Sequence, residues 1–284
     1  MLDRPPAFAL QGASRRFPVG LGLRKRTALF PLDLRLAQGE SLALVGPNGS
    51  GKSTLLRLLA GVDRASAGRV SVLGGDAGSS AVRQRVGWCP ENAPFPADLS
   101  GLAALRLLAS LGGQSAAEAA PALERVGLGD AAGRALRAYS RGMLRRFALA
   151  QAFLGSPDLV LLDEPTAGLD GPGFAVLDDL LEQHRARGGS LVLASHLVAD
   201  VHAHCATLAV LVAGKLVGSG PPAELLAAPG ERIELTGLDS SGLDRLRAWV
   251  GEQGGEVVAS GPRQLPLATL FERASGENAG PQRP

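Results

Sequence analysis

The chain has 284 residues, of which 45% are apolar, and this length allows one main domain with an appendage. Its 29 basic and 27 acidic residues leave a net charge of +2, which creates no field that indicates a nucleic-acid partner. Two cysteines exclude a disulfide framework, and the longest apolar run, Ala206 to Ala213, is far short of the roughly 20 residues of a membrane span. The N-terminus lacks the apolar stretch of a signal peptide. We therefore expect a cytoplasmic protein, and if membranes matter, a partner supplies the span.

The first elements predicted are two antiparallel strands, Phe8 to Arg16 and Leu32 to Leu36, because apolar and polar residues alternate in both. A Gly- and Arg-rich stretch joins them and contains Arg24-Lys25-Arg26. This triplet has two interpretations, contact with phosphates or lipid headgroups and a solvated loop. The sequence favours the solvated loop of an exposed hairpin.

A glycine-rich loop then follows the apolar run Ser41 to Val45, which predicts a buried strand, and precedes Leu55 to Leu59, which predicts an amphipathic helix. The loop fits G-x-x-x-x-G-K-S and consists of Gly46, Pro47, Asn48, Gly49, Ser50, Gly51, Lys52, Ser53 and Thr54. Backbone N–H groups and the helix N-terminus in such a turn face phosphates. The flanking strand and helix disfavour the alternative, a glycine-rich loop without a ligand. The pattern predicts a nucleotide site.

Downstream elements alternate between short strands and helices. A strand is predicted at Arg69 to Leu73, a turn at Gly74 to Asp76 and another strand at Val86 to Pro90. From Ser100 to Ala152, apolar residues recur every three or four positions without strand patterns. This region predicts a helical insert at about residues 92–155.

Strand patterns return after the insert, with a helix between the first two. They lie at Leu159 to Leu162, Leu191 to Ala194, Leu208 to Val212 and Lys215 to Val217. The pattern predicts an α/β fold with a parallel sheet, in a main domain of residues 1–220. Residues 221–284 are predicted to form a small α+β accessory segment with a disordered tail; its strands and helices are expected at 231–236, 240–253, 256–260 and 266–274.

Two carboxylates, Asp163 and Glu164, end the buried strand that begins at Leu159, at the edge where a parallel sheet binds ligands. This is a Walker B pattern. Asp163 is expected to hold Mg²⁺ together with the Ser53 hydroxyl, and Glu164 to activate the attacking water. The alternative is a helix-capping pair before Pro165, which the upstream phosphate loop disfavours.

Between these two motifs, Tyr139 to Phe147 reads Tyr-Ser-Arg-Gly-Met-Leu-Arg-Arg-Phe, a Ser-x-Gly turn that opens a helix. The turn Ala167 to Asp170 and the run Ala194 to His196 complete the order of motifs. This ordered set resembles the ATP-binding-cassette (ABC) ATPases over about residues 8–220.

The resemblance implies a P-loop NTPase with a RecA-like sheet core and an N-terminal antiparallel β-subdomain. It further implies that two subunits, copies of the chain or a homologous ATPase, enclose two ATP with Mg²⁺. Lys52, Glu164 and His196 would be catalytic, with His196 at the γ-phosphate, and Phe17 would stack on the adenine. From the residues alone, His196 is more often structural and Phe17 equally fits a core position. The resemblance also places Ser140, Arg141, Gly142 and Asp170 among the nucleotide-binding residues, with the signature motif supplied by the opposite subunit.

Three features depart from the usual pattern of the family. Glu91 stands where a Gln is usual, which implies a carboxylate near Mg²⁺; the signature reads Ser-Arg-Gly-Met; and the hairpin before Thr27 is long. Together with Leu267 to Arg273, the first two resemble the ABC-2-type exporter ATPases. That subfamily implies separately encoded transmembrane permease subunits, a helical insert that receives their coupling helix, and a peripheral position on the cytoplasmic face of the membrane. The alternatives are a soluble ATP-driven switch acting on ribosomes or nucleic acid, and a regulatory protein that scarcely turns ATP over.

Three polar clusters are interpreted as ordinary helix residues and not as functional sites. His202, His204 and Cys205 are expected on a surface helix, because a spacing of two splits metal ligands across helix faces. The pairs Asp178-Asp179 and Arg145-Arg146 are interpreted as solvated helix charges.

Overall fold

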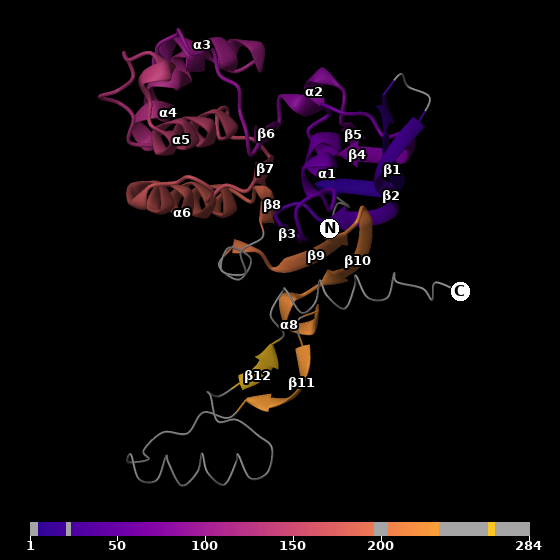
Figure 1. Cartoon of the computed structure of the whole chain (residues 1–284). Coiled ribbons are helices and arrows are strands. Elements are labelled where there is room, and N and C mark those ends of the chain that lie inside the picture. The colour runs from indigo at the N-terminus through magenta and orange to yellow at the C-terminus, as the bar shows by residue number, and fades with distance from the viewer. Residues whose placement is uncertain (1–4, 21–23, 196–203, 226, 233–260, 265–284) are drawn as a thin grey trace, which may run out of the picture. The chain divides into compact units, whose positions relative to one another are not determined.

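The computed structural model describes residues 5–20, 24–195, 204–225, 227–232 and 261–264. The chain divides into two compact units, Met1–Gly220 and Pro221–Pro284. Figure 1 shows the helices α3, α4, α5 and α6 gathered on one side of the larger unit and the strands β1, β2 and β4 on the other.

An antiparallel sheet with the strand order β2-β1-β4-β5 forms the N-terminal part of this unit. Strand β1 covers Phe8–Val19 and β2 covers Arg24–Leu36, so both are longer than the sequence predicts. The prediction of a loop at Arg24 to Arg26 was wrong, because these residues lie in β2 and pair with Val19, Pro18 and Phe17. The residues that the prediction missed, 17–19 and 24–31, include Arg24, Lys25 and Arg26, which are all exposed and so break the alternation that predicts a strand.

A tight hairpin joins β4 (Ala67–Val72) to β5 (Gly75–Asp76). Val72 pairs with Gly75, and both intervening residues have positive φ, 50° at Leu73 and 81° at Gly74. Two positive φ values fit the right-handed twist of a two-residue hairpin. The turn is therefore one residue earlier than predicted from the sequence.

The second sheet has six strands in the order β10-β9-β3-β8-β7-β6, and it is the parallel sheet that the sequence predicts. Its strands are β3 (Ser41–Val45), β6 (Val86–Cys89), β7 (Leu159–Asp163), β8 (Ser190–Ser195), β9 (Thr207–Val212) and β10 (Lys215–Gly220). All neighbours pair in parallel except β9 and β10, which form an antiparallel hairpin. The carboxyl ends of β3, β6, β7 and β8 therefore meet at one edge, where parallel α/β sheets bind ligands.

Helices connect the strands of this sheet. Helix α1 (Lys52–Leu59) follows β3, α2 (Ser80–Arg83) precedes β6, and α6 (Gly171–Ala186) connects β7 to β8. The helical insert contains α3 (Gly101–Leu111), α4 (Ala119–Arg125), α5 (Arg141–Ala152) and the 3-10 turns η1 (Ala116–Glu118) and η2 (Leu136–Ala138). The hydroxyls of Ser100 and Ser140 cap the N-termini of α3 and α5 by accepting hydrogen bonds from the N–H groups of Ala103 and Met143.

One hydrophobic cluster joins the two sheets through α1. It contains Phe8 and Leu36 of the antiparallel sheet, Leu55 and Leu59 of α1, and Leu161 of β7. Because α1 follows the glycine-rich loop directly, this shared core fixes the loop relative to both sheets.

In the smaller unit, α8 (Pro222–Leu225) precedes β11 (Ala227–Arg232), which pairs antiparallel with β12 (Gly261–Gln264). The strand predicted at 231–236 thus begins earlier, at Ala227. The elements predicted at 240–253, 256–260 and 266–274, and the predicted tail, lie outside the described residues. None of the described helices is long and apolar enough to cross a bilayer.

Candidate nucleotide site

The glycine-rich loop turns from β3 into α1 and carries a buried lysine. Lys52 is 7% exposed, begins α1, and its Nζ donates a hydrogen bond of 2.7 Å to the Gly46 carbonyl oxygen. Gly51 has a φ of 108°, and a Cβ there would lie 2.7 Å from Leu29 Cδ2, so only glycine fits this turn. The loop thus places its backbone and one buried ammonium group at the carboxyl edge of the parallel sheet.

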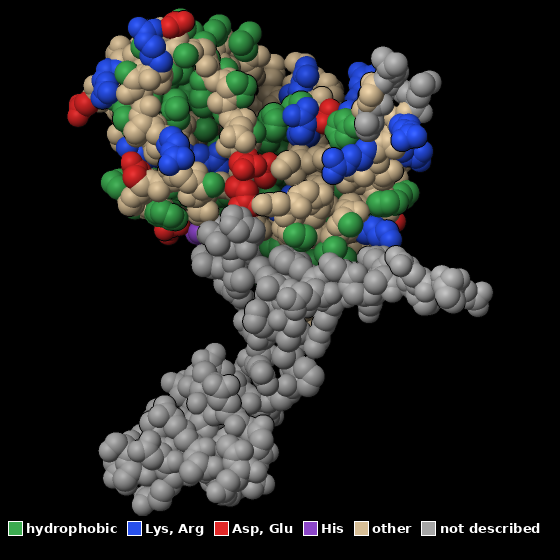
Figure 2. Space-filling view, in the orientation of Figure 1, with side chains coloured by type: hydrophobic (Ala, Val, Ile, Leu, Met, Phe, Trp, Pro, Cys, Tyr) green, Lys and Arg blue, Asp and Glu red, His purple; other side chains and the backbone are tan. Residues whose placement is uncertain are grey.

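This loop borders a cavity of about 1020 Å³. Many of the predicted site residues line it: Phe17, Asn48, Gly49, Ser50, Gly51, Lys52, Ser53, Thr54, Glu91, Asp163 and Glu164. Pro18, Arg26, Thr27, Ala28, Ala167 and Ala213 line it as well, and none of them is among the site residues predicted from the sequence. In Figure 2, acidic side chains gather between the helical insert and the antiparallel sheet, and Lys and Arg side chains lie over the latter.

Asp163 ends β7 and is 4% exposed. Burial raises the pKa of its carboxyl, a hydrogen bond with the Ser53 side chain lowers it, and the nearby carboxylates of Glu91 and Glu164 raise it again. Its Oδ1 atom is buried without a hydrogen-bond partner. A buried carboxylate of this kind is costly unless a cation or donor reaches it.

The residues here fit Mg²⁺. No group of three or more His, Cys, Asp or Glu side chains in the described ranges could hold a metal ion by itself. Magnesium, however, is usually bound by one or two carboxylates together with substrate phosphates and water. The unpartnered Asp163 oxygen beside the Ser53 hydroxyl supplies that incomplete set. Glu91 is exposed, follows the end of β6 and lines the same cavity.

Glu164 follows Asp163 and is also buried, at 7% exposure. Its Oε1 lies 3.8 Å from Lys52 Nζ, and both side chains line the cavity. The backbone of Glu164 has a φ of 48°, in the left-handed region, and its N–H donates to the Ala194 carbonyl at 2.8 Å. A residue with a side chain rarely takes this conformation, which marks a constrained position.

The predicted signature residues lie away from this cavity. Ser140 caps α5 by accepting a hydrogen bond from the Met143 N–H at 3.2 Å, and Asp170 caps α6 by accepting one from the Gly173 N–H at 3.0 Å. A Cβ on Gly142 would lie 2.9 Å from Asp170 Oδ2, so the two turns pack closely. Ser140, Arg141, Gly142 and Asp170 do not line the cavity of their own chain.

His196 lies outside the described residues. Strand β8, which ends at Ser195, pairs in parallel with β3, and Ser195 is the partner of Val45. The end of β8 therefore lies beside the start of the glycine-rich loop. His202 also lies outside the described residues, and His204 Nε2 lies 3.2 Å from Asp178 Oδ1.

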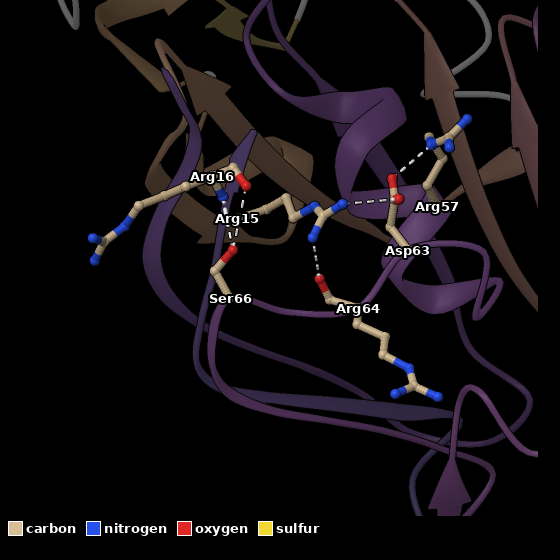
Figure 3. Close-up of polar contacts among 6 residues, drawn as sticks. All are labelled: Arg15, Arg16, Arg57, Asp63, Arg64 and Ser66. Atoms are coloured by element: carbon tan, nitrogen blue, oxygen red, sulfur yellow. Dashed lines mark hydrogen bonds and ion pairs between the residues drawn. The ribbon is translucent and has the colours of Figure 1, made fainter. Parts of the chain in front are cut away.

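Phe17 lines the cavity and has a cation on its ring. The guanidinium carbon of Arg15 lies 4.4 Å from the Phe17 ring centroid. The same guanidinium donates to the Arg64 carbonyl at 2.9 Å and to Asp63 Oδ1 at 3.1 Å, and Arg57 of α1 donates to Asp63 Oδ2 at 2.7 Å. Figure 3 shows Asp63 between the two arginines. The helix that carries Lys52 is thereby linked to the ring at the other side of the cavity.

The interpretation of Arg145 and Arg146 as solvated charges was wrong. Arg145 is 6% exposed and donates to backbone carbonyls around Glu91 and Glu164, while Arg146 pairs with Asp170 at 3.2 Å. A signal was present in the sequence, because the positions of Gly142, Arg145 and Leu149 are three and four apart and place Arg145 on the buried stripe of α5.

A strand, glycine-rich loop and helix that hold a buried lysine opposite two buried strand-end acids define a P-loop nucleotide-binding protein. A family model described as ABC transporter matches residues 29–167. An uncharacterised ABC transporter ATP-binding protein of Synechocystis is 38% identical over 251 residues, which cover 83% of this chain and 71% of the relative. The chain belongs to the ABC transporter ATP-binding proteins, and the expected family is confirmed.

Other relatives have more specific names. The daunorubicin resistance ATP-binding protein DrrA3 of Streptomyces coeruleorubidus is 36% identical, over 94% of this chain and 84% of the relative. The nickel import ATP-binding protein NikO of Rhodobacter capsulatus is 39% identical, over 78% of this chain and 92% of the relative. A solved structure of an ATP-binding subunit of an ABC transporter superposes with a TM-score of 0.71 at 22% identity, covering 95% of this chain and 99% of the other. That likeness confirms the fold.

Proposed function

We propose that this ATP-binding subunit hydrolyses ATP with Mg²⁺ between two ATPase subunits and thereby drives separately encoded transmembrane subunits of an exporter. The observation that carries the proposal is the pair Lys52 and Glu164, 3.8 Å apart and both buried, which lines the cavity bordered by the phosphate loop. A buried ammonium suits the phosphates, and a carboxylate at this place suits the attacking water.

Each residue has a role in this proposal. The loop N–H groups and Lys52 bind the phosphates, Phe17 stacks on the adenine, and Glu164 accepts a proton from water. Ser53 and Asp163 hold Mg²⁺, with Glu91 close to it, and this ion neutralises phosphate charge when bound. His196, by its place in the order of motifs, contacts the γ-phosphate.

The signature residues support a paired arrangement. Ser140, Arg141 and Gly142 form the N-terminus of α5, which offers N–H groups and a hydroxyl to an anion, yet they do not line the cavity of their own chain. Asp170 packs beside Gly142. Such a surface completes the site of a second subunit, which is another copy of the chain or a homologous ATPase.

The direction of transport is proposed from the Ser-Arg-Gly-Met signature, Glu91 and the similarity to DrrA3. In this proposal residues 1–220 are the ATPase domain and residues 221–284 an accessory segment. The helical insert receives the permease, which holds the chain on the cytoplasmic face of the membrane.

Glu164→Gln tests the ATPase function. The amide cannot accept a proton, so we expect ATP binding to persist, turnover to fall by roughly 100-fold and a dimer to accumulate with ATP and Mg²⁺. The control is Glu182→Gln, which changes an exposed carboxylate of α6 and is expected to leave all three quantities unchanged. Turnover of Glu164→Gln at the rate of the unaltered chain would contradict the assignment.

Purification from native membranes tests the partner. We expect the full chain to copurify with a protein of about six apolar spans, encoded in a neighbouring reading frame. ATP-dependent efflux from cells that express both proteins is the expected activity. Copurification with ribosomes, or uptake in place of efflux, would contradict the exporter.

A further inference from the structure

The guanidinium of Arg145 is surrounded by backbone carbonyl oxygens from two strand ends. Its Nη2 donates to Asp163 and Glu164, both at 2.6 Å, and its Nε donates to Pro165 at 3.1 Å. Its Nη1 donates to Pro90 at 2.7 Å and to Glu91 at 3.3 Å. Arginine has five N–H donors in a rigid planar fork, and Arg145 makes five hydrogen bonds to backbone carbonyl oxygens through its Nε, Nη1 and Nη2 atoms.

Through these bonds Arg145 links three elements that are separated in the sequence. Arg145 projects from α5, while its acceptors follow β7 and β6. The side chain is 6% exposed, so water does not replace these bonds. A buried charge is tolerated only where hydrogen bonds or charges compensate its desolvation, and here the carbonyl dipoles do so.

The backbone of Glu164 lies within this contact. Its φ of 48° places a non-glycine residue in the left-handed region, which side chains rarely adopt. The N–H of Glu164 is held by the Ala194 carbonyl, and the carbonyls immediately before and after it, together with its own, accept from Arg145. The direction in which the Glu164 carboxylate leaves the backbone is therefore fixed from two sides.

We propose that Arg145 is a positioning residue for Glu164, which it couples to helix α5. This inference rests on the proposed role of Glu164 as the base. Ser140, which caps α5 and is proposed to contact the opposite nucleotide, lies five residues before Arg145 on the same helix. A shift of α5 on closure of two subunits moves the guanidinium and with it the backbone of Glu164.

Three variants of the full chain test this role. Arg145→Met removes all five hydrogen bonds and keeps an unbranched side chain, whereas Arg145→Lys keeps the charge with three donors. Arg125→Met is the matched control, because it removes an exposed guanidinium from α4 in the same insert. Thermal unfolding shows whether each variant is folded, and Arg145→Lys keeps the test valid if Arg145→Met does not fold.

The expected effect is on turnover and not on binding. Arg145→Met lowers kcat by about 30- to 100-fold, the scale of a 1 Å misplacement of a catalytic group. The dissociation constant for ATP stays within about threefold, because Lys52 and the loop are untouched. Arg145→Lys restores part of the loss. A kcat within about twofold of the unaltered chain in folded Arg145→Met overturns the proposal.

A double-mutant cycle separates positioning from general damage. In the Glu164→Gln background, Arg145→Met is expected to change the residual turnover by less than about twofold, because there is no base left to position. An undiminished 30- to 100-fold loss in that background overturns the proposal, since Arg145 then acts on something other than Glu164. If the unaltered chain hydrolyses no ATP, the proposed function fails, and that outcome is recognised before any variant is compared.

Discussion

Lys52 Nζ lies 3.8 Å from Glu164 Oε1 while it donates a 2.7 Å hydrogen bond to the Gly46 carbonyl. Both side chains are at least 90% buried, so the ammonium is held in place before any phosphate arrives. A preordered donor loses little side-chain entropy on binding, which favours its use as the main phosphate contact.

Lys52→Ala is therefore expected to weaken ATP binding by about 10- to 100-fold, equal to about 1.4–2.8 kcal/mol. Isothermal titration with ATP in the presence of EDTA measures the effect without turnover. Lys215→Ala is the control, because it removes an exposed ammonium from β10 outside the cavity. The affinity of this variant for ATP is expected to match that of the unaltered chain. Equal losses in the two variants would contradict the role of Lys52.

The phosphate loop was predictable from the sequence because its residues are contiguous and their spacing is set by one turn. The Walker B pair was predictable for the same reason. The contact between them was not, because it depends on β3 and β7 lying on either side of β8 in the sheet. Strand order comes from tertiary packing, and no local pattern in this chain encodes it.

A second prediction concerns the link from α1 to Phe17. Asp63→Asn removes the charge that holds both Arg57 and Arg15, and so loosens the guanidinium on the Phe17 ring. We expect the KM for ATP to rise by about three- to tenfold, equal to about 0.7–1.4 kcal/mol, with kcat unchanged. Inhibition by inorganic tripolyphosphate, which has no base to stack, is expected to stay the same.

Asp130→Asn is the control for this experiment, because Asp130 is exposed and does not line the cavity. An equal loss of affinity for ATP and tripolyphosphate in Asp63→Asn would show that the phosphate loop is disturbed. That outcome would contradict a role confined to the adenine end of the cavity.

A third prediction follows from the raised pKa of Asp163. In the folded chain without Mg²⁺, burial favours the protonated carboxyl, so the native state binds more protons than the unfolded state. Stability is then highest below the ordinary pKa of the carboxyl and falls as the pH rises through the raised one. Asp163→Asn has no carboxylate charge to bury, so its stability is not expected to fall in this way as the pH rises.

At neutral pH in EDTA, we therefore expect Asp163→Asn to melt at a higher temperature, by roughly 2–4 °C for a gain of about 1 kcal/mol. The difference is expected to shrink as the pH falls and Asp163 becomes protonated. Stabilisation by ATP with Mg²⁺ is expected to be lost in the variant. A melting temperature below that of the unaltered chain at neutral pH would contradict the uncompensated burial of this carboxylate.

The burial of Arg145 was not predicted from the sequence. Two adjacent arginines on a helix suggest a solvated face, and only the buried stripe of α5 separates Arg145 from Arg146. The extended hairpin shows a related limit, because three consecutive exposed charges, Arg24 to Arg26, interrupt the alternation that predicts a strand. The signature residues were found by their order along the chain, although they do not line the cavity of their own chain and are proposed to complete that of a second subunit.

The last prediction separates the two roles of Ser140. Its hydroxyl caps α5, and Ser100 caps α3 through the same bond at the same distance, 3.2 Å. Ser140→Ala and Ser100→Ala are both expected to cost about 1 kcal/mol of stability. Ser140→Asp keeps the cap, since aspartate caps as well as serine does, but it places a negative charge toward the opposite γ-phosphate. In the Glu164→Gln background, Ser140→Asp is expected to abolish the ATP-dependent dimer seen by size-exclusion chromatography, whereas Ser100→Asp keeps it. A dimer of undiminished amount in Ser140→Asp would contradict contact between this helix end and the nucleotide of a second subunit.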